Sequence, residues 1–160
     1  MATEKLNFKL ELYATMWDKP PHAEILINDQ SMFDGDITGT EDQPNLITFT
    51  YELEEEKEYD LIIKRTGKTK GQTVVNDKGD IIQDQLLKIK NITIDEIDIG
   101  GLVYEGVYTP EYPEPWASQQ RAAGHELEKS FNKVTFMGHN GEWKLKFASP
   151  FYMWLLENLY

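Results

Sequence analysis

Aromatic residues are the strongest candidates for chemistry in this sequence. Tyrosine and tryptophan recur four positions apart in two places, first at Tyr13 and Trp17 and then at Tyr108, Tyr112 and Trp116. Such rings combine a flat apolar face with a polar edge, which suits sugar rings and protein hot spots alike. The pattern indicates a binding surface for a glycan or a protein. The alternative is that the rings fold back and fill one end of the core.

Aspartates in short polar segments are candidates for a metal site. They form two pairs, Asp34 with Asp36 and Asp77 with Asp80. Calcium prefers several oxygen ligands, which loops of this kind supply. Neither pair has the helix-loop-helix calcium pattern, and aspartate is favoured in turns without any metal. Calcium is therefore a candidate cofactor, and solvated turns are the alternative.

Local enzyme signatures are missing from the sequence. Gly67–Thr69 resembles the end of a phosphate-binding loop, but Ile62 stands where that loop requires glycine. His125 lacks a second histidine at the zinc-protease spacing, and no Gly-x-Ser-x-Gly elbow occurs. The sequence thus favours a protein that binds and does not catalyse. A small hydrolase with a dispersed site, around His125 or His139, is an alternative.

The composition restricts the partners. The 160 residues carry a net charge of −12, which repels nucleic-acid phosphates and anionic lipid. No apolar run is long enough to cross a bilayer, and no signal-peptide pattern opens the sequence. Without cysteine there are no disulfides and no sulfur-based zinc sites. We expect synthesis in the cytoplasm, no membrane insertion and no general nucleic-acid binding.

Alternating apolar residues predict strands along most of the chain. The clearest run is 6–16, which Asp18–Pro21 ends. Residues 46–53 and 59–65 are predicted to pair as one hairpin. A second hairpin is predicted around the Asn-Gly turn at 140–141. Further strands are predicted at 22–27, 31–37, from 74, at 81–82, along 86–99, at 131–137 and at 142–147.

The pattern changes in the second half of the chain. Apolar parity switches at 95–96, which predicts a β-bulge. Residues 102–116 are rich in tyrosine and proline and are predicted to form a long ordered loop. A short helix is predicted over 115–123, ended by Gly124.

The tail, residues 149–160, is apolar on nearly every side. Ser149 as a cap and a proline at the next position predict a short helix, with a strand as the alternative. Its apolar side chains need cover, either in the protein's own core or in a partner or a neighbouring subunit. The candidates for such a partner contact are Phe151, Trp154 and Leu155.

These elements predict one mainly β domain over residues 1–160. About nine short strands separated by turns are typical of an antiparallel β-sandwich of jelly-roll type, with a closed barrel as the alternative. The order of strands, from 8–13 through 86–97, resembles small carbohydrate-binding modules of the calcium-dependent xylan-binding type. That resemblance implies a jelly-roll sandwich, a loop-bound Ca²⁺ and a sugar hydroxyl that completes its coordination. It assigns no individual ligand residue in this chain.

The segments 112–116 and 138–147 resemble parts of uncharacterised proteins of tailed phages of marine bacteria. This second resemblance implies a virion-associated or host-manipulating protein. Together the observations predict a non-enzymatic, phage-encoded module that binds glycan. The alternatives are a phage structural or assembly protein that binds other proteins through the sandwich and the tail, and the small hydrolase. An oligomer is compatible with each of these.

Overall fold

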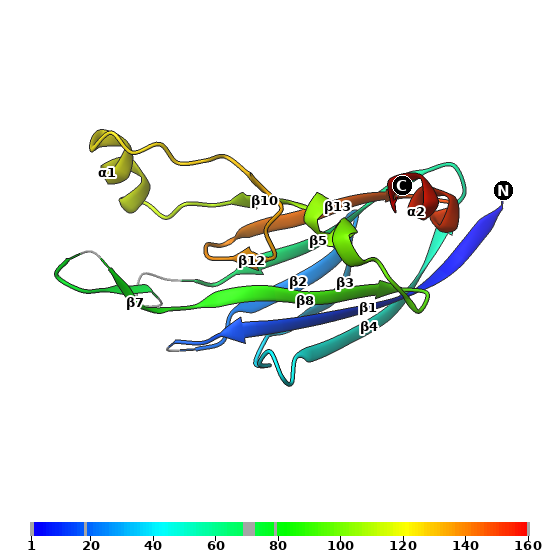
Figure 1. The fold of residues 1–160 in the computed structure, drawn as a ribbon, viewed down its shortest axis with the longest axis horizontal. Helices are drawn as coiled ribbons and strands as arrows, with labels where there is room; N and C mark the ends of the chain where they lie inside the picture. Colours follow the sequence, from blue (N-terminus) through cyan, green and yellow to red (C-terminus); the bar gives the residue numbers. More distant parts are fainter. Residues whose placement is uncertain (1, 18, 69–72, 79, 160) are drawn as a thin grey trace.

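The protein is a sandwich of two antiparallel sheets, the predicted jelly-roll type (Figure 1). The computed structural model describes residues 2–17, 19–68, 73–78 and 80–159. The end of the Gly67–Thr69 motif and the basic loop around 69–72 lie outside the described residues, as does Gly79 of a predicted turn.

The two sheets and a separate ribbon contain all the strands of the described residues. The five-stranded sheet has the order β12 (Phe136–Met137), β8 (Leu86–Ile94), β1 (Thr3–Thr15), β4 (Asn45–Glu54), with β9 (Ile97–Asp98) also paired to β8. The six-stranded sheet has the order β11 (Phe131–Asn132), β10 (Val107–Pro110), β13 (Gly141–Ala148), β5 (Glu58–Thr66), β2 (His22–Ile27), β3 (Gln30–Asp36). The ribbon pairs β6 (Thr73–Val75) with β7 (Ile81–Asp84).

The core lies between the sheets because each strand directs alternate side chains inward. In β1 the predicted apolar face is buried from Leu6 to Leu12. From the other sheet, β13 contributes Trp143, Leu145 and Phe147, the alternating apolar residues of the predicted strand 142–147. These side chains belong to one continuous apolar cluster. The period of two is therefore sufficient to predict the core face of both sheets.

Both predicted hairpins are wrong. Strand β4 pairs with β1, whereas β5 lies in the other sheet between β13 and β2. In the same way, β12 pairs with β8 while β13 pairs with β10 and β5. Each connection therefore crosses from one sheet to the other. In such a connection the apolar faces of the two strands both point into the core. The two strands therefore show the same alternation of apolar and polar residues as a hairpin within one sheet.

The predicted bulge at 95–96 is instead a two-residue turn between β8 and β9. Ile94 pairs with Ile97, so Asp95 and Glu96 form the loop. Their φ angles are 53° and 65°, as the tight hairpin turn with two left-handed residues requires. The parity switch in the sequence marks this turn and not an extra residue in a strand.

The segment 102–116 is partly regular and not one long loop. It contains the end of a 3₁₀ helix, η2 (Gly100–Glu105), and the strand β10. The predicted short helix is confirmed as α1 (Trp116–Ala122), followed by Gly124 with a φ of +90°. The predicted tail helix is α2 (Phe151–Leu159). No helix in the described part of the chain is long and apolar enough to cross a membrane.

The tail packs against the protein's own core, which is the first of the two interpretations. Phe151 is fully buried, Leu155 is 5% exposed, and the half-buried Trp154 ring contacts Phe147 and Phe151. The carboxylate of Glu4 accepts hydrogen bonds from the Phe151 N–H, at 2.7 Å, and from the Ser149 hydroxyl, at 2.8 Å. The cap of α2 thus comes from β1, and Phe151, Trp154 and Leu155 pack within the protein's own fold.

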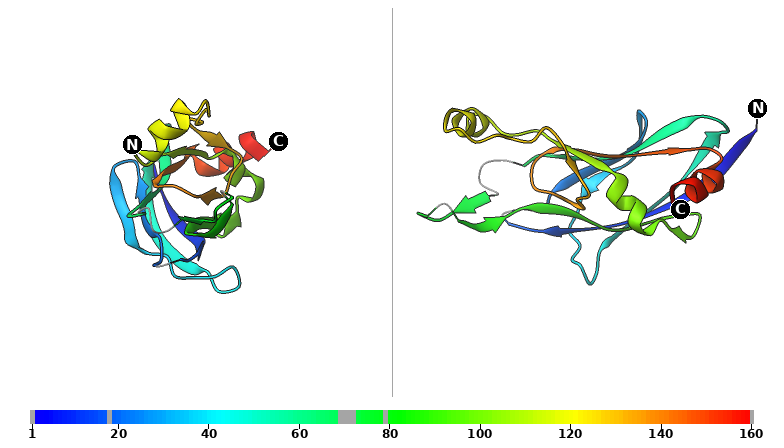
Figure 2. Two further views of the ribbon diagram at one scale, coloured as in Figure 1. Left: turned by 90° about the vertical axis from the view of Figure 1, so that its left-hand side faces the viewer. Right: turned by 45° about the horizontal axis from the view of Figure 1, so that its top comes forward.

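The sandwich is elongated, and its two ends differ (Figures 1 and 2). The chain termini and α2 lie at one end, which we call the terminal end. The helix α1 and the β6–β7 ribbon project from the opposite end, which we call the loop end. Among the described residues, the connections at the loop end include β1–β2, β7–β8, the segment from β10 to β11, and β12–β13.

Candidate functional site

Three aromatic rings from separate segments meet at the loop end. Tyr112 follows β10, Trp116 opens α1, and His139 lies between β12 and β13. The ring centroids of Tyr112 and Trp116 are 6.0 Å apart, and the imidazole lies 5.1 Å from Tyr112 and 5.6 Å from Trp116. Trp116 is 37% exposed, and the other two are half-buried. We call these three residues the ring cluster; its faces are partly open to solvent.

A network of polar side chains fixes the segment that carries His139 of the ring cluster. The Lys68 ammonium donates hydrogen bonds to Asp84, at 2.8 Å, and to the Gly138 carbonyl. The Lys68 N–H donates to the Asn140 side-chain oxygen at 2.9 Å, and the Asn140 amide donates back to the Lys68 carbonyl at 3.1 Å. The connection that contains His139 is thereby fixed to the end of β5.

His139 is a neutral imidazole at physiological pH. Burial lowers the pKa of His139 below its ordinary value. The positive charge of Lys68 acts in the same direction, as does the weaker effect of Arg65, whereas Asp84 acts in the opposite direction. A neutral imidazole has one donor and one acceptor nitrogen. Within the described residues, no side chain hydrogen-bonds to its ring. His139 therefore combines a flat face with polar edges that can meet a ligand's hydroxyl groups.

Tyr108 lies in the core and not on the exposed surface that the sequence suggested. The side chain is 4% exposed and stacks on Phe131, with centroids 6.2 Å apart. Its hydroxyl donates to the His139 carbonyl at 2.6 Å and accepts from the His139 N–H at 2.9 Å. Burial raises the pKa of Tyr108 to about 12. Tyr108 is thus a positioning residue for the backbone of His139.

Arg65 is the residue of the loop end that sequence reasoning missed. It is the last residue of the predicted strand 59–65, where its charge alone would favour exposure, yet it is fully buried. Its guanidinium donates to the Met137 carbonyl and, at 2.7 and 2.6 Å, to the main-chain and side-chain oxygens of Gln85. Gln85 in turn donates to the Lys19 carbonyl at 2.7 Å. Burial lowers the pKa of Arg65 to about 10, so the charge persists at neutral pH.

Tyr13 and Trp17 lie outside the ring cluster. Tyr13 is half-buried on the outer face of the five-stranded sheet, and the Lys88 ammonium lies 5.7 Å from its ring centroid. Trp17 is 39% exposed in the turn after β1, where the Lys19 N–H donates to the Trp17 carbonyl at 2.9 Å. The structure therefore brings together Tyr112 and Trp116 from the five predicted aromatic residues.

The four aspartates proposed as metal ligands have other partners. Asp36 and Asp34 both bond to His22, Asp36 at 2.9 Å to Nδ1 and Asp34 to Nε2. Asp77 and Asp80 lie in the exposed β6–β7 turn, where Asn76 accepts from the Asp80 N–H at 3.0 Å. In the described ranges no group of three or more His, Asp and Glu side chains is arranged to hold a metal ion. The four predicted aspartates therefore do not form such a group.

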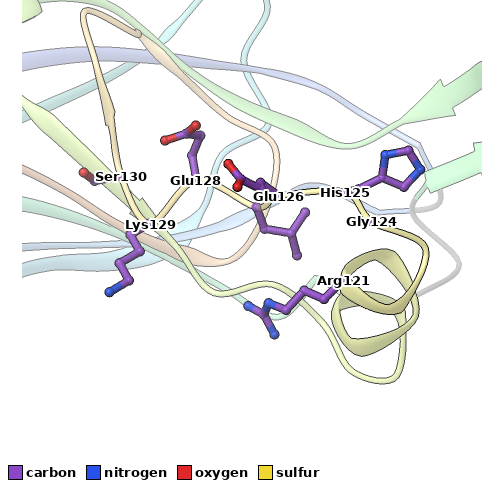
Figure 3. A pocket seen from close by; sticks show the side chains of 8 residues that line it. Arg121, Gly124, His125, Glu126, Glu128, Lys129 and Ser130 are labelled. Carbon is purple, nitrogen blue, oxygen red and sulfur yellow. The ribbon is translucent and has the colours of Figure 1, made fainter.

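An open groove of about 580 Å³ follows α1 (Figure 3). Its lining includes His125, Glu126 and Glu128, the combination that a hydrolase with a dispersed site would need. Figure 3 shows the imidazole on one side of the groove and the two carboxylates on the other. Among the described residues no hydrogen bond joins His125 to either carboxylate. A hydrogen-bonded base and orienting group of the kind a nucleophilic site uses is therefore not seen among the described residues of this groove.

Two solved structures are similar to this chain in fold. The first is described as vCBM60 in complex with galactobiose. The comparison covers 87% of this chain and 96% of that one, with a TM-score of 0.50 and 7% identity. The chain has the fold of a carbohydrate-binding module. This confirms the predicted resemblance at the level of fold.

The second structure is the selenomethionine form of vCBM60, described as part of an evolutionary link between two families of calcium-dependent carbohydrate binding modules. The comparison covers 88% of this chain and 89% of that one, with a TM-score of 0.50 and 7% identity. The sequence matches no family model and no curated protein. At this identity the likeness shows the fold and transfers no ligand residue to this chain.

Proposed function

We propose that the protein is a non-catalytic module that binds a glycan at the ring cluster. The observation that carries this proposal is the meeting of Tyr112, Trp116 and His139 at the loop end. Their faces match the apolar faces of sugar rings, and the imidazole edge and the adjacent loop carry hydrogen-bonding groups. The shared fold with a galactobiose-bound module supports this function.

The rings are held in place before any ligand arrives. Tyr108 fixes the main chain of His139, and the Tyr112 hydroxyl donates to the Glu128 carbonyl at 2.6 Å. Preorganised rings lose little conformational entropy on binding, which favours affinity from a small contact area. We infer a binding mode in which a sugar stacks on Trp116 and bonds to His139 at its edge.

Replacing Trp116 by alanine tests this function. The variant is expected to lose galactobiose or xylobiose binding by about 10-fold or more, because a stacked ring contributes on the order of 1 kcal/mol beyond its buried area. Tyr104→Ala is the matched control, since Tyr104 is 50% exposed on η2, outside the ring cluster. Titration calorimetry measures both variants beside the wild type. A wild-type protein that binds no member of a broad glycan array would exclude the proposal.

Calcium is a variable in the same titrations. Because the described residues contain no group of three or more His, Asp and Glu side chains that could hold a metal ion, the expected result is equal affinity with EDTA and with added Ca²⁺. A fall in affinity with EDTA, restored by Ca²⁺, would contradict this expectation. It would show that calcium takes part in the binding.

We also propose that the module is encoded by a tailed phage and associated with its virion. The support is the resemblance of the segments 112–116 and 138–147 to phage proteins. Capsid or tail genes beside the coding sequence, and the protein in purified particles, are the expected findings. A gene among bacterial polysaccharide-degrading enzymes would contradict a phage origin.

A further inference from the structure

A row of side chains crosses the outer face of the five-stranded sheet close to the ring cluster. Phe136 of β12 pairs with Lys88 of β8, and Lys88 pairs with Tyr13 of β1. Directly paired residues direct their side chains to the same face of a sheet. Phe136 is 51% exposed, and Tyr13 and Lys88 are half-buried. The row therefore presents a ring, an ammonium group and a second ring side by side.

The row and the ring cluster are adjacent along the chain and in space. His139 follows Phe136 by three residues, which span at most about 10 Å. Two strand spacings separate Phe136 from Tyr13, again about 10 Å. Between Phe136 and His139 lies Gly138, where a Cβ atom would stand 3.6 Å from the Leu86 side chain, in ordinary contact. Phe136 thus lies within about 10 Å of His139 along the chain and about 10 Å from Tyr13 across the sheet.

The core does not explain the position of Phe136. Its neighbour Met137 is 1% exposed and fills the inward position of β12, so Phe136 points to solvent on a short edge strand. Half of a phenyl ring exposed on a sheet face has a hydration cost that a bound apolar surface would remove. Lys88, which lies between the two rings, can donate hydrogen bonds to hydroxyl groups.

We propose that Phe136, Lys88 and Tyr13 extend the binding site, so that the protein binds a linear oligosaccharide longer than a disaccharide. This inference rests on the proposed function of the ring cluster. The first sugar units occupy Trp116 and His139, and the following units pass over Phe136 to Lys88 and Tyr13. The occupant is a chain segment, because His139, Phe136 and Tyr13 follow one another at steps of about 10 Å or less.

Chain-length series of galactose and xylose oligosaccharides test the extension. The wild type is expected to bind the tetraose more tightly than the biose. In Phe136→Ala, affinity for the tetraose falls by about 2- to 10-fold, while affinity for the biose is unchanged. Phe136→Leu keeps the apolar volume without the ring, and its tetraose affinity falls as well. Tyr104→Ala, with its exposed ring outside the row, keeps the wild-type dependence on chain length.

Each outcome of these titrations bears on one proposal or both. Equal affinity of the wild type for biose and tetraose overturns the extended site and leaves the ring cluster as the binding site. A Phe136→Ala variant that binds tetraose as tightly as the wild type also overturns it. If Trp116→Ala loses the biose and Phe136→Ala loses only the gain from chain length, both proposals hold. If neither series binds the wild type, the proposed function fails, and the extension fails with it.

Discussion

At the scale of single residues, the loop end depends on side chains whose roles cannot be predicted from the residues next to them in the sequence. Tyr108 and Tyr112 have the same type and belong to the same spacing of four, yet one is buried and the other contributes to the ring cluster. The difference arises because Tyr108 lies within β10, where alternation directs Tyr108 and Pro110 inward, whereas Tyr112 lies beyond the end of that strand. When the segment is interpreted as a loop, that parity is lost. Sequence reasoning therefore found Tyr112 and Trp116 but could not separate them from Tyr108.

His22 provides a prediction about pH. Hydrogen bonds to Asp36 and Asp34 raise the pKa of His22 above its ordinary value. A group whose pKa is raised by folding contributes stability below its unfolded pKa, and that contribution is lost as the pH rises through the folded pKa. His22→Gln should therefore lower the melting temperature more at about pH 5.5 than at about pH 8.5.

The quantity to compare in this experiment is the difference in melting temperature between the wild type and His22→Gln at each pH. His139, whose pKa is lowered, has the opposite dependence on pH, but it is present in both and cancels. The effect is expected to be small because the His22 side chain is 37% exposed and water screens its charge. A stability difference that is independent of pH would contradict the assigned ion pairs.

At the scale of elements, the sequence predicted strands and helices better than it predicted their partners. The alternation in β4 and β5 is correct for both strands, yet it does not say whether two strands share a sheet or face each other across the core. The tail shows the same limit. Its helix start was predicted from Ser149 and Pro150, whereas the carboxylate that caps it belongs to Glu4 in β1. Contacts between distant segments leave no local trace in a single sequence.

The cap from Glu4 makes α2 dependent on β1. Glu4→Ala removes the acceptor of the Phe151 N–H and is expected to lower the free energy of unfolding by about 1 kcal/mol, as for other lost helix caps. Glu4→Gln, which keeps an oxygen acceptor but loses the charge at the helix N-terminus, should have a smaller effect. Urea denaturation measures both. The control is Glu105→Ala, an exposed carboxylate on η2; equal losses for Glu4→Ala and Glu105→Ala would refute the cap.

At the scale of the whole molecule, Arg65 joins the connections of the loop end to one another. Through Met137, Gln85 and Lys19 its hydrogen bonds reach the segments β12–β13, β7–β8 and β1–β2. Buried positive charge of this kind is retained only where several acceptors surround it. The sequence could not show this, because the three segments are far apart along the chain and become neighbours only when the sandwich closes.

Arg65→Met is expected to destabilise the protein by roughly 3 kcal/mol, since it leaves buried oxygen atoms without donors. Arg65→Lys keeps the charge but has fewer hydrogen-bond donors, so its stability should lie between those of Arg65→Met and the wild type. Chemical denaturation gives these free energies, and amide hydrogen exchange should show the greatest loss of protection in the three connections. A loss below about 1 kcal/mol would mean that the guanidinium network contributes little to the fold.

The opposite placement of the chain termini and the loop end has a practical consequence (Figure 1). A tag, a surface anchor or a neighbouring domain attached at either terminus holds the molecule by the end that carries α2. The ring cluster then points away from the attachment and stays open to a polymer in solution or on a cell. Immobilisation through either terminus should therefore give the same binding curve, and the domain can be fused in either order without covering the proposed binding site.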